Sequence, residues 1–411
     1  MSERRRVLLG VIAVVMVLLV VGSGLVTTAM IANYQNVGTL TRVISLIEKN
    51  YLEKVTAATL VEGAVKGVVE SLDDPYSVYM PAKEFKKLQE QVKGFFGGIG
   101  IFVDTRGDQL TVAKPIEGTP AYKKGIKSGD VIVKINDKET KGMDPDVAIN
   151  MMRGPVGTKV KLVVFRKSAH KMLTFEITRE EIEVPTVEGK ILPGTDIAYI
   201  QLSLFTTVTD NELGNVLKKL IKERTGKEVS PANFQDFKGE LKKSGILGII
   251  LDLRDNPGGE LEAATRVADL FIPKGPIVFI DYRAGEDEIH EADDNRIDLP
   301  LAVLVNGGSA SASEIVAGAV KDTKAGTVVG TKTFGKGVVQ SIFPLQNDAG
   351  LKLTTARYLT PQKHDINKKG ITPDVVVEIP EEAAPGTEKY DEGKDAQLQK
   401  AVSILQEKIN R

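Results

Sequence analysis

The hydrophobic pattern of the chain begins with an apolar run from Val7 to Ala32 that contains no charged residue. At about 1.5 Å of rise per residue, a helix of this length crosses the roughly 30 Å hydrocarbon core of a bilayer. The preceding Arg4-Arg5-Arg6 cluster favours a cytoplasmic start, which places the rest of the chain outside the cytoplasm. A cleaved signal peptide is the alternative, because Ala29 and Ala32 are small residues near a candidate cleavage point. We expect an uncleaved, single-pass anchor over residues 7–32 in the cell membrane.

After this run, residues 33–93 show apolar positions at helical spacing. Two amphipathic helices are predicted, followed by the turn signal Asp73-Asp74-Pro75 and a third helix over residues 82–92. The pattern leaves open whether the apolar stripes pack on each other, on the body or on a second copy of the chain. The stripes consist of Leu40, Ile44, Ile47 and Tyr51, and of Leu60, Ala64, Val68 and Leu72.

The pattern of apolar and glycine residues changes from residue 94 onward. Residues 94–181 alternate short β-type segments with glycine turns, which predicts a small β domain. Residues 182–380 alternate strand-like and amphipathic segments, which is typical of an α/β core. Within this core, the apolar run GILGIILDLRDNPGG (245–259) predicts a strand covered on both faces, and residues 223–245 predict a polar surface excursion. The last segment, 381–411, predicts a linker and a helix whose apolar stripe must pack on another surface.

A candidate nucleophile lies where the predicted strand 301–305 turns into a helix. Ser311 falls near the start of that helix, where free N–H groups and the helix dipole favour an alkoxide and an oxyanion. Ser309 and Ser313 are rivals, and an ordinary N-cap is the simplest alternative.

A second buried strand ends at Gly258-Gly259, and the carboxyl ends of neighbouring strands in such a sheet lie close together. We therefore expect the N–H groups of Gly258 and of Ala312, which directly follows Ser311, to act as oxyanion donors.

The candidate base is Lys336, because apolar surroundings lower the pKa of a lysine enough for it to be neutral near pH 7. Gln340 would hold the amine without adding a negative charge. A solvated surface lysine is the plain alternative.

Two other motif matches are discounted. The GxxxxGK match at 330–336 is not taken as a phosphate loop, because Gly337 stands where Ser or Thr should bind magnesium. The SxxK match at 168–171 is weak, because no partner motif of the penicillin-binding class accompanies it.

Composition narrows the classes of function. The chain has 411 residues and a formal net charge of -1, which gives no reason to expect a nucleic-acid partner. It has no cysteine, which excludes disulfides, thiol catalysis and thiolate-bound metal. Its three histidines, at 170, 290 and 364, have no metal-ligand spacing and lie away from the candidate serine, so a Ser-His-Asp triad is hard to place. We expect no cofactor and no metal.

Residues 94–181 resemble a PDZ domain. Gly97-Gly98-Ile99-Gly100-Ile101 is similar to the carboxylate-binding loop of that family, and GTPAYKKGIKSGDVIVKIN (118–136) is similar to its helix-and-strand signature. N–H groups beside glycines form a nest for a terminal carboxylate, and a strand edge accepts an extended peptide. The resemblance implies that Gly98, Ile99, Gly100 and Ile101 bind peptide; a plain small β domain is the alternative.

The whole chain resembles the carboxyl-terminal processing (tail-specific) proteases, serine peptidase family S41. The motifs that carry the resemblance occur in the family's order: LDDPYSVYM, LDLRDNPGG, NGGSASASEI, GTKTFGKGVVQ, LTTARYLTP and GITPD. The resemblance maps the nucleophile to Ser311, the base to Lys336 and the supporting glutamine to Gln340. This chain departs from the usual pattern of the family in two places. Residues 223–245 are longer than the family commonly has, and Gln362-Lys363-His364-Asp365 replace the more usual Ser-Gly after YLTP.

The resemblance implies a crotonase-like (ClpP/crotonase) α/β protease core with an inserted PDZ domain. It further implies an endopeptidase that cleaves protein substrates near accessible C-termini, with the PDZ domain engaging the tail and gating activity. We expect the body in the periplasm or at the cell exterior, and a homodimer formed through the terminal helices. A catalytically silent, membrane-tethered PDZ scaffold or peptide-binding chaperone is the alternative. The predicted bounds are 1–6 cytoplasmic tip, 7–32 anchor, 33–93 helical region, 94–181 PDZ domain, 182–380 protease core and 381–411 linker and terminal helix.

Overall fold

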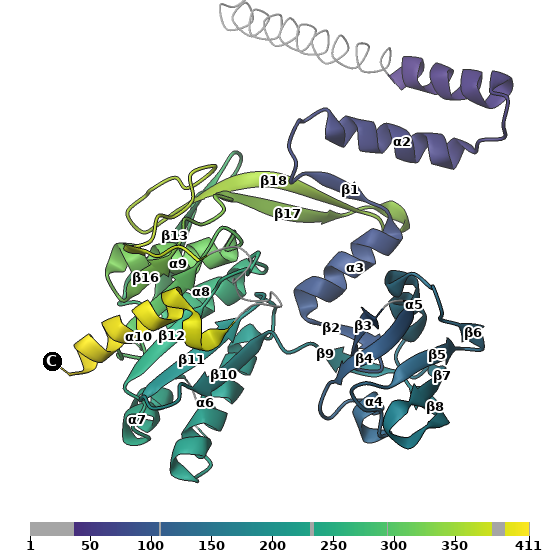
Figure 1. The fold of residues 1–411 in the computed structure, drawn as a ribbon. Helices are drawn as coiled ribbons and strands as arrows, with labels where there is room; N and C mark the ends of the chain where they lie inside the picture. Colours follow the sequence, from purple (N-terminus) through teal and green to yellow (C-terminus); the bar gives the residue numbers. More distant parts are fainter. Residues whose placement is uncertain (1–36, 107, 231–233, 294, 380–390, 411) are drawn as a thin grey trace, which may run out of the picture. The chain divides into compact units, whose positions relative to one another are not determined.

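The computed structural model describes residues 37–106, 108–230, 234–293, 295–379 and 391–410 (Figure 1). The predicted anchor over residues 7–32 lies outside these ranges. Within them, no helix combines the length and the apolar character that a membrane crossing requires. The chain falls into two compact units, which divide between Tyr79 and Met80.

The first unit contains the first two of the three predicted helices. Residues 37–50 are helical, and α2 spans Ala57–Glu70 after the N-cap Thr56, whose side chain accepts the Thr59 N–H at 3.2 Å. A short strand, β1 (Val78–Met80), begins in this unit and includes the first residue of the second. Several residues of the two predicted stripes are exposed in the single chain. These are Leu40, Tyr51, Val68 and Leu72.

The second unit begins with α3 (Ala82–Lys93), which confirms the third predicted helix. A small β domain follows, with strand order β3-β4-β5-β7-β8, β6 paired to β5, and a separate β2-β9 pair. Its own apolar core includes Ile99, Val112, Ile132 and Leu162. The elements are β2 (Phe95–Gly98), β3 (Ile101–Arg106), β4 (Gln109–Pro115), α4 (Pro120–Lys123), β5 (Val131–Ile135), β6 (Lys138–Glu139), α5 (Pro145–Met152), β7 (Lys159–Arg166), β8 (Lys171–Thr178) and β9 (Glu180–Glu183).

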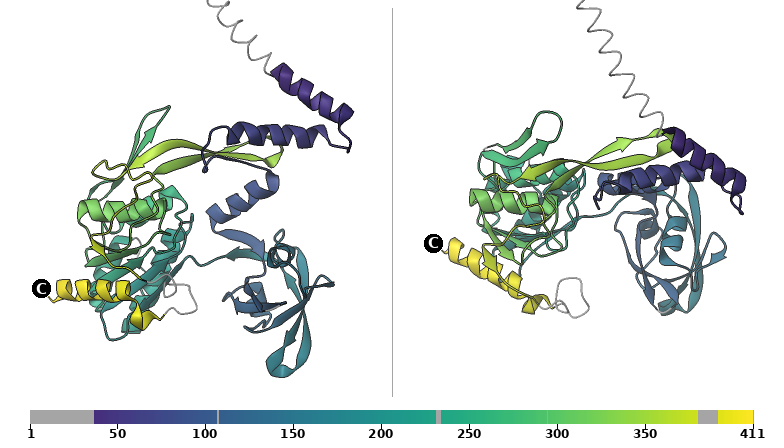
Figure 2. Two further views of the ribbon diagram at one scale, coloured as in Figure 1. Left: turned by 45° about the horizontal axis from the view of Figure 1, so that its top comes forward. Right: turned by 90° about the horizontal axis from the view of Figure 1, so that it is seen from above.

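The α/β core is built on a sheet of order β10-β11-β12-β15-β16-β19, in which only the β10-β11 pair is antiparallel. One face of this sheet packs on α6, α8 and α9, and the other face packs on α10. Figure 2 shows α10 in yellow on the opposite side of the sheet from α9 in green. The bounds are β10 (Val187–Ile191), β11 (Ile197–Leu202), α6 (Thr209–Thr225), β12 (Gly248–Asp252), α8 (Leu261–Asp269), β15 (Leu301–Val305), α9 (Ala312–Thr323), β16 (Thr327–Gly330), β19 (Val375–Val376) and α10 (Ala396–Ile409).

A second sheet joins β17 (Val338–Pro344), β18 (Gly350–Leu359), β13 (Gly275–Tyr282) and β14 (Glu288–Ala292), all in antiparallel pairs.

In the first sheet, strands β12 and β15 are buried along their whole length, because helices cover both faces of that sheet. This confirms the prediction for both apolar runs.

The predicted surface excursion over residues 223–245 is wrong in part. Helix α6 continues to Thr225, and a further helix, α7, spans Phe234–Lys243. The Phe237 and Leu241 side chains are buried in the same core as α6. Because the apolar residues of α7 are few and widely spaced among charges, their pattern alone does not reveal that one face of the helix is covered.

Candidate active site

Ser311 is the N-cap residue of α9, directly after the turn that follows β15. Its backbone has φ 54° and ψ −114°, a region that non-glycine residues seldom occupy. Such a strained turn persists only where surrounding contacts hold it, and it is often found at functional sites. The Ser311 residue is partly exposed, whereas the residues that follow it at the start of α9 are buried.

The two rival serines are buried and their hydroxyl groups are committed to the backbone. Ser309 Oγ donates to the Leu253 carbonyl at 2.7 Å, and Ser313 Oγ donates to the Asn256 carbonyl at 2.9 Å. These two serines therefore tie the helix start to the β12 turn. Of the three serines, Ser311 alone is not buried.

The turn after β12 meets the turn after β15, as the strand pattern predicts. Gly258 has φ +102°, and a Cβ atom on it would lie 2.7 Å from the Ala310 carbonyl, 2.8 Å from Ser311 Cβ and 2.9 Å from Ala312 N. Only glycine allows this approach without strain. As the first residue of α9, Ala312 has an N–H with no carbonyl of a preceding helical turn to bond.

The Gly258 N–H is already engaged in this structure. It donates to Asn256 Oδ1 at 2.9 Å, while Asn256 Nδ2 donates to the Leu202 carbonyl at 2.7 Å. The Asn256 carbonyl accepts the Ala310 N–H at 3.0 Å. Asn256 is fully buried and so fixes the Gly258 turn against both β11 and the segment before Ser311. Sequence reasoning treated Asn256 only as a turn residue.

A buried carboxylate joins the two candidate catalytic residues. Glu314 is fully buried in α9, and its oxygens accept the Ser311 N–H at 3.0 Å and the Lys336 N–H at 2.9 Å. The same carboxylate accepts the Gly335 N–H at 2.8 Å and the Thr333 hydroxyl at 2.6 Å. Hydrogen bonds to an ionised acceptor are among the stronger ones in proteins. Glu314 was missed from the sequence, although Ser-x-x-Glu at a helix start is the pattern of a capping box.

Lys336 and Gln340 come from the turn after β16 and from β17. The Lys336 residue is partly buried, and the neighbouring Phe334 N–H donates to the Ser309 carbonyl at 3.0 Å. Gln340 lies at an irregularity of β17 opposite Thr354. Its Nε2 is 3.4 Å from the Val338 carbonyl and 3.5 Å from Thr354 Oγ1, at the edge of hydrogen-bonding range. The structure thus brings the Ser311 and Lys336 backbones together on one carboxylate and leaves Gln340 weakly held.

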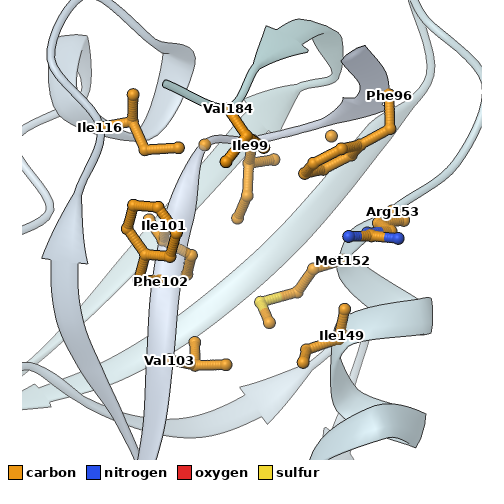
Figure 3. A pocket seen from close by; sticks show the side chains of 12 residues that line it. Phe96, Ile99, Ile101, Phe102, Val103, Ile116, Ile149, Met152, Arg153 and Val184 are labelled. Atoms are coloured by element: carbon orange, nitrogen blue, oxygen red, sulfur yellow. The ribbon is translucent and has the colours of Figure 1, made fainter. Parts of the chain in front are cut away.

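The small β domain contains an apolar groove of about 260 Å³, shown in Figure 3. The predicted loop Gly98 to Ile101 lines one side of it, and α5 lines the other with Ile149 and Met152. The backbone N–H groups of Ile99 and Gly100 donate no hydrogen bond to any of the described residues. The predicted loop therefore presents free donors at an apolar groove, the arrangement that a terminal carboxylate requires.

Arg153, directly after α5, is a groove residue that sequence reasoning missed. Its guanidinium carbon lies 3.9 Å from the centroid of the Phe96 ring, and its buried Nε atom has no hydrogen-bond partner among the described residues. Arg179 holds the end of α5 by donating to the Met151 carbonyl at 2.8 Å and to the Met152 carbonyl at 2.9 Å. The groove thus carries a positive group in a fixed position.

Comparison with known proteins gives three matching sequence profiles. The profile of peptidase family S41 matches residues 196–377, and the profile of a PDZ domain matches residues 111–166. The profile of the N-terminal domain of the activating protease CtpB matches residues 26–84.

Several curated proteins are similar over most of their length. A carboxy-terminal-processing protease of Bartonella bacilliformis is 37% identical over 366 residues, which cover 88% of this chain and 80% of that protein. The carboxy-terminal processing protease CtpA of Bacillus subtilis is 38% identical over 346 residues, covering 84% and 69%. A probable CtpA-like serine protease of Staphylococcus aureus is 34% identical over 377 residues, covering 90% and 71%.

Proposed function

This chain belongs to the carboxy-terminal processing proteases of peptidase family S41, as a serine-type peptidase with a PDZ domain, and on that premise we propose that Ser311, Lys336 and Gln340 form its catalytic site. The reaction is endopeptidase cleavage of protein substrates near the C-terminus. The observation that supports this site best is the Glu314 carboxylate, which accepts the N–H groups of both Ser311 and Lys336. These two hydrogen bonds hold the backbones of the proposed nucleophile and the proposed base on the same carboxylate.

The proposed chemistry proceeds by proton transfer through Lys336. In its neutral form, the Lys336 amine accepts the Ser311 hydroxyl proton as Ser311 Oγ attacks the scissile carbonyl carbon. The ammonium then gives a proton to the departing amine as the C–N bond breaks, which leaves an ester on Ser311. Lys336 next accepts a proton from water as the water oxygen attacks the ester carbon. It then returns a proton to Ser311 Oγ as the bond between Oγ and the acyl carbon breaks, which releases the new C-terminal carboxyl group and restores the free serine. Gln340 orients the amine without adding a charge.

The oxyanion of each tetrahedral intermediate is held by the N–H groups of Ala312 and Gly258. Ala312 offers its N–H at the positive end of α9. The Gly258 N–H bonds Asn256 Oδ1 in this structure, so it must turn away from that oxygen or share its proton when an oxyanion forms. An oxyanion is the stronger acceptor, because charged acceptors make stronger hydrogen bonds than neutral amide oxygens.

The PDZ groove is proposed to engage the substrate tail and thereby gate cleavage. Support comes from the free N–H groups of Ile99 and Gly100, the apolar wall and the guanidinium of Arg153. A C-terminal carboxylate satisfies the N–H groups, an apolar terminal side chain fills the groove, and Arg153 supplies positive charge.

We further propose that residues 7–32 anchor the protein in the cell membrane, with the body in the periplasm or at the cell exterior. The core is proposed to be of the crotonase-like type, and the chain to form a homodimer through its terminal helices. The exposed apolar residues of the helical region, such as Leu40 and Val68, support the dimer. Light scattering tests it: a monomeric mass for the chain without residues 1–32 would refute the homodimer.

The catalytic proposal is tested by comparing the wild type with Ser311→Ala and Lys336→Ala on an unfolded protein substrate. Both variants should lose cleavage, with loss of at least about a thousandfold for each. Wild-type rates in both variants would exclude the Ser-Lys mechanism. Substrate binding with no cleavage by the wild type would instead favour a silent PDZ scaffold. The pH profile is a second measurement, since activity should fall on the acid side as Lys336 becomes protonated; a flat acid side would count against Lys336 as the base.

A further inference from the structure

Tyr358, near the end of β18, is buried in the core beneath the candidate active site. Its exposed fraction is 2%, and it stands opposite Ile280 of β13 in the antiparallel pairing. Its ring belongs to the main apolar core of the protease region. Its own N–H donates to the Gly337 carbonyl at 3.2 Å, which ties β18 to the turn that carries Lys336.

The Tyr358 hydroxyl group lies between the backbones of the two catalytic residues. It donates to the Ser311 carbonyl at 3.1 Å and is also hydrogen-bonded to the Lys336 carbonyl. A hydroxyl has a single proton, so the two carbonyl oxygens share one donor. The Ser311 carbonyl has further donors in the N–H groups of Glu314 and Ile315, at 2.8 Å and 3.0 Å.

Glu314 and Tyr358 divide the backbone groups of the two residues between them. The Glu314 carboxylate accepts both N–H groups, and the Tyr358 hydroxyl serves both carbonyl groups. The peptide units on both sides of each of these two residues are thereby held by a hydrogen bond.

We propose that Tyr358 is a positioning residue whose hydroxyl group sets the Lys336 backbone, and with it the amine, relative to Ser311. The inference rests on the proposed Ser-Lys function. Tyr358 lies in the LTTARYLTP motif (353–361), to which the sequence analysis assigned no catalytic residue. Loss of the hydroxyl leaves the Lys336 carbonyl without this donor and lets its turn shift. Proton transfer depends steeply on such placement, whereas substrate binding by the PDZ groove does not involve this turn.

The test is Tyr358→Phe in the full chain, which removes one oxygen and keeps the ring. The matched control is Tyr199→Phe, which removes another buried tyrosine hydroxyl, one that donates to Asp252 Oδ2 at 2.7 Å rather than to a catalytic residue. Steady-state cleavage of an unfolded protein is measured with thermal unfolding, at a temperature where circular dichroism shows both variants folded. We expect kcat to fall roughly tenfold in Tyr358→Phe with KM little changed, and the acid side of the pH profile to move. Tyr199→Phe should keep the wild-type kcat and pH profile.

Three results would overturn the inference. One is a wild-type kcat and pH profile in Tyr358→Phe, and another is an equal loss of kcat in both variants at equal loss of thermal stability. The third is a rise of KM at unchanged kcat in Tyr358→Phe. Ser311→Ala and Lys336→Ala run beside them separate the two levels: if these two cleave like the wild type, the Ser-Lys function itself is wrong. If they are inactive and Tyr358→Phe is normal, only the role of Tyr358 is wrong.

Discussion

The Glu314 carboxylate accepts the backbone N–H of Ser311 at 3.0 Å although the Glu314 side chain is fully buried. A buried carboxylate is costly unless hydrogen bonds compensate it, and Glu314 accepts four of them. The positive φ of Ser311 is therefore held in place by a group that also holds the Lys336 turn. Strain at the proposed nucleophile and order at the proposed base have a common support.

Glu314→Gln should damage both stability and activity. An amide has one acceptor oxygen and turns its NH₂ group towards backbone N–H donors, so some of these buried donors lose their partner. We expect the free energy of unfolding to fall by about 1–3 kcal/mol and kcat to fall at least about tenfold. Denaturant unfolding and steady-state cleavage measure the two effects. The exposed Glu262→Gln in α8 is the control, and equal behaviour of the two variants would contradict the role given to Glu314.

Gly258→Ala should remove activity while the overall fold persists. The new methyl group would lie within 2.9 Å of Ala310 O, Ser311 Cβ and Ala312 N, at a φ of +102° that alanine seldom adopts. The turn must move away from Ser311, which misplaces the proposed oxyanion donor, and kcat should fall by about a hundredfold or more. Gly307→Ala is the matched control, because a Cβ atom there has no neighbour within 4 Å. Full activity of Gly258→Ala would exclude this turn from the site.

Arg153→Gln should weaken recognition of a free C-terminus. The guanidinium lies against the Phe96 ring, and its Nε atom has no hydrogen-bond partner within the described ranges. We expect KM to rise roughly fivefold for a substrate with a free terminal carboxylate, and to change little for the same substrate amidated at its C-terminus. Fluorescence binding and cleavage assays with the two substrates give the comparison. The exposed Lys123→Gln serves as control, and equal effects on both substrates would refute carboxylate recognition by Arg153.

Glu212 should make stability depend on pH in a defined direction. Burial raises the pKa of Glu212 above its ordinary value near 4.5, against hydrogen bonds from Thr186 that lower it. A carboxyl group with a raised pKa in the folded state stabilises the fold fully below its unfolded pKa, and this contribution is lost as pH rises through the folded pKa.

The measurement is the melting temperature of the wild type minus that of Glu212→Gln, followed from about pH 4 to pH 7, across the ordinary carboxyl pKa. This difference should decrease as pH rises, because only the wild type must bury a carboxylate there. Glu223→Gln, on an exposed position of the same helix, should show no such trend. A difference that increases with pH would mean that the hydrogen bonds from Thr186 outweigh burial.

The sequence by itself determined the elements and the main groups of the site. Continuous apolar runs specify β12 and β15, since only strands covered on both faces need apolar residues at every position. The glycine pair after β12 and the serines before α9 mark two turns at the same edge of a parallel sheet, and this shared edge is why the strand pattern alone pairs Gly258 with Ser311. Motif order assigned the chain to its family and named Lys336.

The tertiary structure decided which polar residues connect these groups. Glu314, Asn256 and Tyr358 each contact a residue far along the chain. The capping-box pattern anticipates the bond from Glu314 to Ser311, but no local pattern records that these side chains meet Lys336 or Leu202. The covered face of α7 and the Arg153 Nε atom, which has no hydrogen-bond partner in the described part of the chain, likewise depend on what packs nearby. Local spacing determines which face of an element is apolar, whereas the partner of a buried polar atom is settled only when distant segments come together.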